Sequence, residues 1–256
     1  MSETERTYRR WLDTDLRSFE VRIDESDLLI SLSPEALAKG DVSHRDLAKR
    51  ALASVRADLE SYLRRDPGFA PALQPYDPLP DAPPIVCEMA AAARACGVGP
   101  MAAVAGAVAQ HVGEALLAET PQVIVENGGD IFLYTSRPRT AAIFAGSSPL
   151  SGRLGLCISR TGQGLGLCTS SGTVGPSLSF GRADAAIVLA GSAALADAAA
   201  TALGNRIQTE ADIAPALDHL QTIPGILGGA AIIGEHLGAW GEVELVRVGA
   251  HGGEGD

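Results

Sequence analysis

The sequence predicts an α+β fold in which a mixed or antiparallel sheet is packed by helices. Apolar and polar residues alternate at 17–23 and partly at 28–32, on either side of an acidic turn, which is typical of a β-hairpin. Two apolar runs within 123–133 flank an Asn-Gly pair, which indicates a second hairpin. Apolar residues recur every three to four positions over 43–65, which predicts a helix with Ser43 as its N-cap.

The middle of the chain is interrupted by a proline-rich segment. Residues 66–84 contain seven of the fifteen prolines, which excludes a helix or a central strand. The segment is either a linker between two lobes or an ordered strap that carries four large apolar residues across the surface. Helices are predicted at 85–95 and from 101 to about 119, separated by a Gly-Val-Gly-Pro break. Gly99, Gly106 and Gly113, spaced seven apart, form a glycine stripe that allows another backbone or a ligand to come close.

The second half completes the sheet and adds two helices. Its predicted elements are a strand at 141–145, a helix from Ser192 to Gly204, a helix from Thr209 to about Gln221, and strands at 225–233 and 242–248. We expect one domain over 1–256, consisting of an N-terminal hairpin and helix (1–65), the strap (66–84), a core (85–250) and a tail (251–256).

Charge and composition exclude several classes of function. The net charge is -11, the aromatic share is 4 %, and Lys39 and Lys49 are the only lysines. A protein that binds nucleic acid needs a basic surface, so no nucleic-acid partner is expected. The missing lysines also exclude a phosphate loop and a Schiff base in the glycine-rich half. Met1 to Arg10 does not resemble a signal peptide, and no apolar run reaches the roughly 20 residues that span a bilayer. A cytoplasmic protein without membrane contact is expected.

A short repeat places two cysteines on predicted neighbouring strands. Leu-Gly-Leu-Cys ends at Cys157 and again at Cys168, and a two-residue turn at Gly162-Gln163 would set Cys157 directly opposite Cys168. A loop of odd length would instead place the two side chains on opposite faces of the sheet. The pair is therefore predicted as two neighbouring thiols rather than a stable disulfide.

The turn after Cys168 predicts a site for an anion. Thr169, Ser170, Ser171, Gly172 and Thr173 combine hydroxyl groups with backbone N–H groups at the end of a strand. Such a turn suits anion binding and would lower the pKa of a nearby thiol. The alternative is that Cys168 is an inert core residue.

Two further clusters are candidates for ligand binding. Asp197 and Thr201, at i and i+4, project from a helix face without the long charged side chains of a solvated surface. A covered carboxylate must be paired, hydrogen-bonded or bound to a metal. Asp197 and Thr201 are therefore candidate ligands of a hard cation such as Mg²⁺; the alternative is that Asp197 is a structural residue held by hydrogen bonds. The turn formed by Asn127, Gly128, Gly129 and Asp130 either closes a hairpin only or also lines the rim of a site.

At these positions the sequence resembles the ApbE superfamily, whose members include magnesium-dependent FAD:protein FMN transferases. The similarity covers most of residues 85–205, including the segment up to Gly-Gly-Asp130, the Thr169–Gly172 turn, and the stretch from Asp197 to Thr201. It implies an ApbE-like fold and identifies Asp197 and Thr201 as the metal ligands. The resemblance indicates Mg²⁺ as a possible cofactor.

Over its whole length the chain is similar to a smaller family of uncharacterised ApbE-like proteins. The motifs that carry this similarity are Glu25–Leu28, Gly97–Gly106, Glu126–Asp130 and Cys168–Gly175. Relatives in this family have been linked to sulfur incorporation during homocysteine formation. Pro176–Gly181 replaces the histidine-containing segment of the FMN transferases, which argues against FMN transfer and against FAD as a cofactor.

The leading hypothesis from the sequence is a sulfur-transfer protein. Cys168 would carry a persulfide, Cys157 would be its partner, and the donor or acceptor of sulfur would be a small molecule or a protein. One alternative is a divergent Mg²⁺-dependent flavin-nucleotide transferase or FAD-binding protein that uses Asp197 and Thr201. Another is a non-catalytic binding protein, and a homo-oligomer is possible in each case.

Overall fold

The computed structural model describes residues 15–37, 41–159, 161–173 and 179–248, and it confirms the α+β class. In chain order the elements are β1 Arg17–Ile23, β2 Ser26–Leu32, α1 Pro34–Leu37, α2 Asp41–Arg65, α3 Pro84–Cys96, the 3₁₀ helix η2 Pro100–Ala103, α4 Val104–Leu117, β3 Val123–Asn127, β4 Asp130–Tyr134, β5 Arg139–Ala142, β6 Leu154–Ile158, β7 Leu165–Ser170, β8 Ala185–Ala190, α5 Ala193–Asn205, the 3₁₀ helix η3 Glu210–Asp212, α6 Ile213–Leu220, β9 Ile226–Ile233, β10 His236–Gly241 and β11 Glu244–Arg247.

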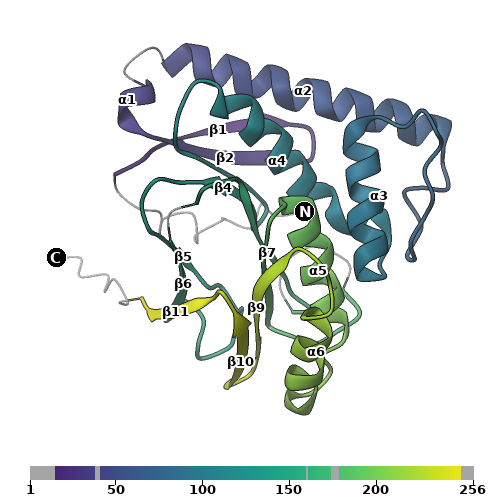
Figure 1. Cartoon of the computed structure of the whole chain (residues 1–256), viewed down its shortest axis with the longest axis vertical. Helices are drawn as coiled ribbons and strands as arrows, with labels where there is room; N and C mark the ends of the chain where they lie inside the picture. Colours follow the sequence, from purple (N-terminus) through teal and green to yellow (C-terminus); the bar gives the residue numbers. More distant parts are fainter. Residues whose placement is uncertain (1–14, 38–40, 160, 174–178, 249–256) are drawn as a thin grey trace.

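The strands form one large and one small sheet. The large sheet has eight strands in the order β1-β2-β3-β4-β7-β8-β9-β10, and the small sheet has three in the order β11-β6-β5. Every strand pair within these sheets is antiparallel. The sheet is therefore antiparallel rather than mixed. Figure 1 shows the small sheet on the side of the large sheet away from α5.

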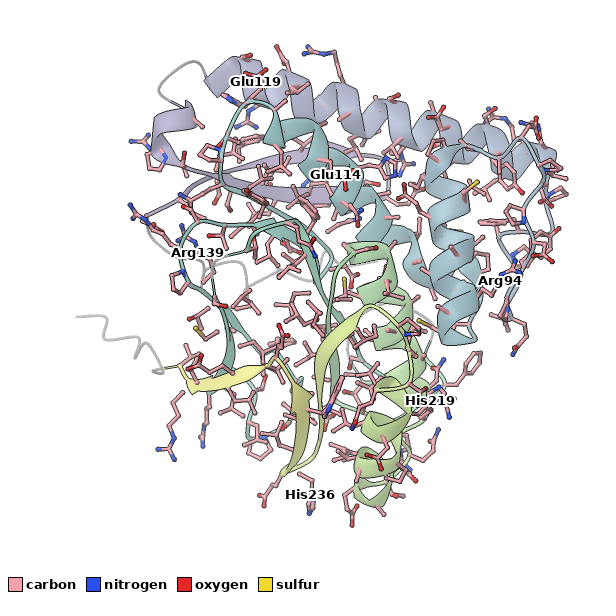
Figure 2. The ribbon with its side chains drawn as sticks, in the orientation of Figure 1. Arg94, Glu114, Glu119, Arg139, His219 and His236 are labelled. Atoms are coloured by element: carbon pink, nitrogen blue, oxygen red, sulfur yellow. The ribbon has the colours of Figure 1, made fainter. Side chains whose placement is uncertain are left out.

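Two hydrophobic cores lie on opposite faces of the large sheet. The main core joins β1 to β4 with α2, α3, α4 and α5 and includes Leu52, Met89 and Leu203. The second core lies between the two sheets and includes Leu156 and Ile187. Arg139, labelled in Figure 2, begins β5 as a buried residue, and its guanidinium pairs with the Asp15 carboxylate.

The proline-rich segment is an ordered strap rather than a free linker. Phe69 is fully buried and makes edge-to-face contacts with Tyr62 and Tyr76. Both tyrosine hydroxyls donate to Asp66, over 2.6 Å from Tyr62 and 2.8 Å from Tyr76. Burial and the hydrogen bond to Asp66 raise the pKa of Tyr62 to about 12, so the hydroxyl remains a donor over the whole physiological range. The strap is therefore held by an apolar anchor and a buried polar network.

Several boundaries differ from the prediction for local reasons. Helix α2 begins at Asp41, so Ser43 lies inside it and is not the N-cap. The predicted helix from 101 begins with the 3₁₀ turn η2, because Pro100 opens it. Strand β10 was not predicted, since its Gly-rich sequence lacks the apolar alternation of a strand. The predicted tail at 251–256 falls outside the described residues.

The predicted pairing of Cys157 with Cys168 is wrong. In β6, Cys157 pairs with Thr140 of β5 and Glu244 of β11, within the small sheet. In β7, Cys168 pairs with Val188 of β8, within the large sheet. The Leu-Gly-Leu-Cys repeats therefore form strands of two different sheets, because the partners of each strand come from distant parts of the chain.

Helices α3 and α4 meet at a sharp bend within the core. Among the described residues, no single helix is both long and apolar enough to cross a membrane. Of the helices described, only a bent pair reaches the length and apolar composition of a membrane-spanning helix. This pair consists of Pro84–Cys96 and Pro100–Leu117, with a bend of 104° between them.

Candidate functional site

The site candidates from distant parts of the chain converge on the ends of β4 and β7, beside α5. Asn127 and Asp130 are paired across the β3–β4 turn, whose two glycines have φ of 69° and 110°. These left-handed conformations favour glycine, which is why Gly128 and Gly129 form the turn. Asn127 Nδ2 donates to the Ala105 carbonyl over 3.1 Å, and this bond fixes the turn against the start of α4. The turn therefore closes the hairpin and also holds Asn127 against the start of α4.

Asp197 projects from α5 toward the first turn of α4. Its Oδ2 accepts the Gly106 N–H over 2.9 Å. A β-carbon on Gly106 would lie 2.2 Å from the Ala193 carbonyl oxygen, so only glycine allows the two helices this approach. Ser192 caps α5 as predicted, with its hydroxyl accepting the Leu195 N–H over 3.2 Å. The glycine stripe therefore brings α4 close enough to hold the Asp197 carboxylate.

Asp130 and Asp197 form a desolvated pair of acids. Burial raises the pKa of Asp130 to about 7, while the Cys168 thiol and the Thr169 N–H partly offset the rise. Burial and then the charge of Asp130 raise the pKa of Asp197 well above its usual value. Asp130 is half-buried overall, but its Oδ1 is fully buried and has no hydrogen-bond partner among the described residues. A buried oxygen of this kind calls for a proton or a cation.

Cys168 lies beside this acid pair but has the wrong surroundings for a reactive thiol. It is fully buried, and its Sγ donates to the Ala193 carbonyl over 3.4 Å. Burial, followed by the charges of Asp130 and Asp197, raises the pKa of the thiol well above its usual value. The structure therefore favours the inert thiol. An activated thiolate requires an electropositive and exposed position, which Cys168 lacks.

The hydroxyl-rich turn after Cys168 directs most of its donors inward. The N–H of Thr169 faces Asp130, and that of Gly172 donates to the Ala183 carbonyl over 2.9 Å. The Thr173 N–H donates to the Ser171 hydroxyl over 3.1 Å, and the Thr173 hydroxyl donates to Asp184 over 2.9 Å. The predicted anion cradle of backbone N–H groups is therefore wrong for these three residues, because the protein itself satisfies them.

The available oxygens suit a hard cation with few protein ligands. Within the described ranges, no three His, Cys, Asp or Glu side chains are arranged to hold a metal ion by themselves. The free Oδ1 of Asp130, the Asp197 carboxylate and the Thr201 hydroxyl one turn along α5 offer oxygen ligands only. Mg²⁺ is commonly bound by one or two carboxylates together with water and substrate phosphate. The residues present therefore fit Mg²⁺ whose remaining ligands come from outside the protein.

The sequence matches the protein-family model described as "AbpE bacteria" over residues 9–236. The chain belongs to this family. It is also similar to curated proteins named UPF0280 protein, with 48 % identity to that of Methanocella arvoryzae over 75 % of this chain and 79 % of the relative. Identity to the UPF0280 protein of Methanosarcina acetivorans is 43 %, over 82 % of this chain and 83 % of the relative.

Two of the solved structures to which the chain is similar are flavin transferases. The apo form of the Pseudomonas stutzeri flavinyl transferase ApbE shares 15 % identity, with a TM-score of 0.46 over 90 % of this chain and 95 % of the other. The flavin transferase ApbE of Vibrio cholerae shares 14 % identity, with a TM-score of 0.45 over 90 % and 97 %.

The sequence singled out Gly106 as part of the glycine stripe, but it did not show that the Gly106 N–H holds Asp197. Asp184 was missed in the sequence. Asp184 binds the Thr173 hydroxyl and the Gly234 N–H, over 2.9 and 2.8 Å. An isolated Asp before the buried run of β8 gave no pattern that sequence reasoning could use.

Proposed function

We propose that the chain binds a flavin nucleotide through Mg²⁺ held at Asp130, Asp197 and Thr201. The observation that carries this proposal is the buried Oδ1 of Asp130, which lacks a hydrogen-bond partner among the described residues and lies near a second desolvated carboxylate. A divalent cation at this point would neutralise both acids and relieve their desolvation. The flavin part of the proposal rests on the resemblance to the ApbE superfamily and on membership of the matching family.

The protein residues would position the carboxylates before any ligand binds. The Gly106 N–H orients Asp197, and the Asn127 amide fixes the turn that carries Asp130. Mg²⁺ would supply electrostatic stabilisation of the phosphate oxygens. No histidine is among the residues described at this site, so we propose that the chain binds a nucleotide. Transfer of the nucleotide would need a general base that these residues do not supply.

Calorimetric titration with FAD and FMN, in Mg²⁺ or in EDTA, tests the proposal. We expect binding that requires Mg²⁺, and we expect Asp197→Asn to weaken it by more than about tenfold, because a carboxylate ligand contributes charge that an amide lacks. Asp218→Asn, on the exposed side of α6, is the matched control and should bind as the wild type does. Flavin binding that is absent, or equal in EDTA, would rule out the proposal.

Sulfur transfer through Cys168 is the competing hypothesis. The burial of Cys168 and the raised pKa of its thiol argue against this hypothesis, because a persulfide carrier must present a thiolate to its sulfur donor. Mass spectrometry of the folded protein after treatment with a sulfane-sulfur donor separates the two hypotheses. A gain of one sulfur on Cys168, together with no flavin binding, would favour sulfur transfer.

A further inference from the structure

The segment Ser179–Arg182 is fixed across the C-terminal end of α5. The Phe180 N–H donates to Asn205 Oδ1 over 2.8 Å, and Gln208 Nε2 donates to the Phe180 carbonyl over 2.8 Å. Two residues on, the Arg182 N–H donates to the Ile207 carbonyl over 2.8 Å. Both backbone groups of Phe180 are therefore held by side chains, which is more than a surface loop needs.

Close backbone contacts hold the same segment in place. A β-carbon on Gly181 would lie 1.8 Å from the Gly204 carbonyl oxygen, and one on Gly172 would lie 2.1 Å from the Gly181 carbonyl oxygen. The segment therefore lies between the turn that follows β7 and the end of α5. Neither neighbour leaves room for a side chain at these glycines, so the backbone of Phe180 has little freedom to move.

Phe180 nevertheless leaves its side chain in solvent. The residue is 57 % exposed, whereas most large apolar residues of the described chain lie in the two cores. Exposure of an aromatic ring forgoes the free energy of burial. A ring on an immobilised backbone loses little further freedom when a planar ligand stacks on it, so this arrangement suits a binding surface.

Helix α5 connects Phe180 to the acid pair. Asp197, Thr201 and Asn205 follow one another at four-residue steps on α5, and Asn205 holds Phe180. The helical rise separates Asp197 from Asn205 by about 12 Å along the axis. Alongside α5, the Ser170 hydroxyl lies 3.6 Å from the β-carbon position of Gly204, and the preceding Thr169 N–H faces Asp130. Figure 1 shows β7 and α5 as neighbours over this length.

We propose that Phe180 is a stacking platform for the planar ring of the bound nucleotide. This inference rests on the proposed function, in which the cation and phosphate lie at Asp130 and Asp197. A ligand that reaches both points must carry its ring well away from its phosphate, as FMN does across its ribityl chain. Phe180 therefore sets the preference for a flavin over ligands that carry phosphate alone.

Two probes, FMN and inorganic pyrophosphate, test the inference in the presence of Mg²⁺. Phe180→Ala should weaken FMN binding by about tenfold, which is within the range of base–aromatic stacking, and should leave pyrophosphate binding unchanged. Phe180→Trp should retain FMN affinity and quench flavin fluorescence more strongly, whereas Phe180→Leu should behave as Phe180→Ala does. Leu73→Ala, at a residue that is 56 % exposed on the strap, is the matched control for losing an exposed apolar side chain.

The outcomes separate this inference from the proposed function. Unchanged FMN affinity in Phe180→Ala, or an equal loss for FMN and pyrophosphate, would overturn the stacking role while leaving cation-dependent binding intact. A wild-type protein that binds neither probe would overturn the proposed function, and the stacking role with it.

Discussion

Single residues at this site have properties that their sequence neighbours do not reveal. Cys168 precedes a turn rich in hydroxyl and N–H groups, which predicts an activated thiolate. In the structure it faces two carboxylates, and those charges add to burial in raising the pKa of its thiol. Burial is the larger cause, and the two acids that add to it, Asp130 and Asp197, are distant in sequence and could not be placed beside the thiol by pattern alone.

Thiol titration of the folded protein should follow exposure. Cys87 is exposed and Cys157 is half-buried, whereas Cys96 and Cys168 are buried, and burial raises the pKa of Cys96 to about 12. We expect Cys87 to react fastest with an aromatic disulfide reagent and the two buried thiols to react only on unfolding. A Cys87→Ser, Cys157→Ser variant should lack any fast phase. A fast phase that persists in this variant would show an accessible Cys168 or Cys96 and would strengthen the case for sulfur transfer.

At the level of elements, α3 and α4 are joined by an ion pair as well as by apolar contacts. His111 Nε2 lies 2.9 Å from Glu88 Oε2, and this hydrogen bond is the main reason that the pKa of His111 is raised. Burial opposes the rise, while the charges of Glu114 on the same helix and Asp58 on α2 support it. The contact therefore links three helices through the charge of one histidine.

Stability should depend on pH through this pair. Because the folded state raises the pKa of His111, its contribution is complete below about pH 6.5 and is lost as pH rises through the folded pKa. Glu88→Gln should reduce the free energy of unfolding by up to about 1 kcal/mol at acidic pH, since the pair is partly exposed, and by almost nothing at alkaline pH. Urea unfolding at both pH values measures the difference. In a His111→Gln background the same substitution should have no pH-dependent effect, and a persisting effect would contradict the assignment.

Elements with a local cause could be predicted, and those with distant partners could not. The β3–β4 hairpin follows from Gly128 and Gly129, and the start of α5 follows from Ser192, so both were placed correctly. The β6–β7 hairpin failed because β7 pairs with β4 and β8 instead. For the same reason, the sequence predicted a covered Asp197 but could not show that Gly106 bonds to it or that Asp130 lies near it.

For the molecule as a whole, the strap connects the outer helix layer to the site. It links α2 to α3, and its Ala72 carbonyl lies 1.8 Å from the β-carbon position of Gly99, just before η2 and α4. The first turn of α4 in turn supplies the Gly106 N–H that holds Asp197. The strap therefore packs against the segment that leads into α4, although it contributes no residue to the site.

Phe69 should be the main anchor of this strap. Phe69→Ala removes a fully buried ring between Tyr62 and Tyr76, and we expect it to reduce the free energy of unfolding by about 3–5 kcal/mol. Leu73→Ala removes a side chain that is 56 % exposed on the same strap and should cost less than about 1 kcal/mol. Chemical denaturation measures both values, and limited proteolysis should cleave the Phe69→Ala protein first within residues 66–83. Equal stability of the two variants would mean that the strap is a passive linker, and that the approach of α4 to Asp197 is set by the helices alone.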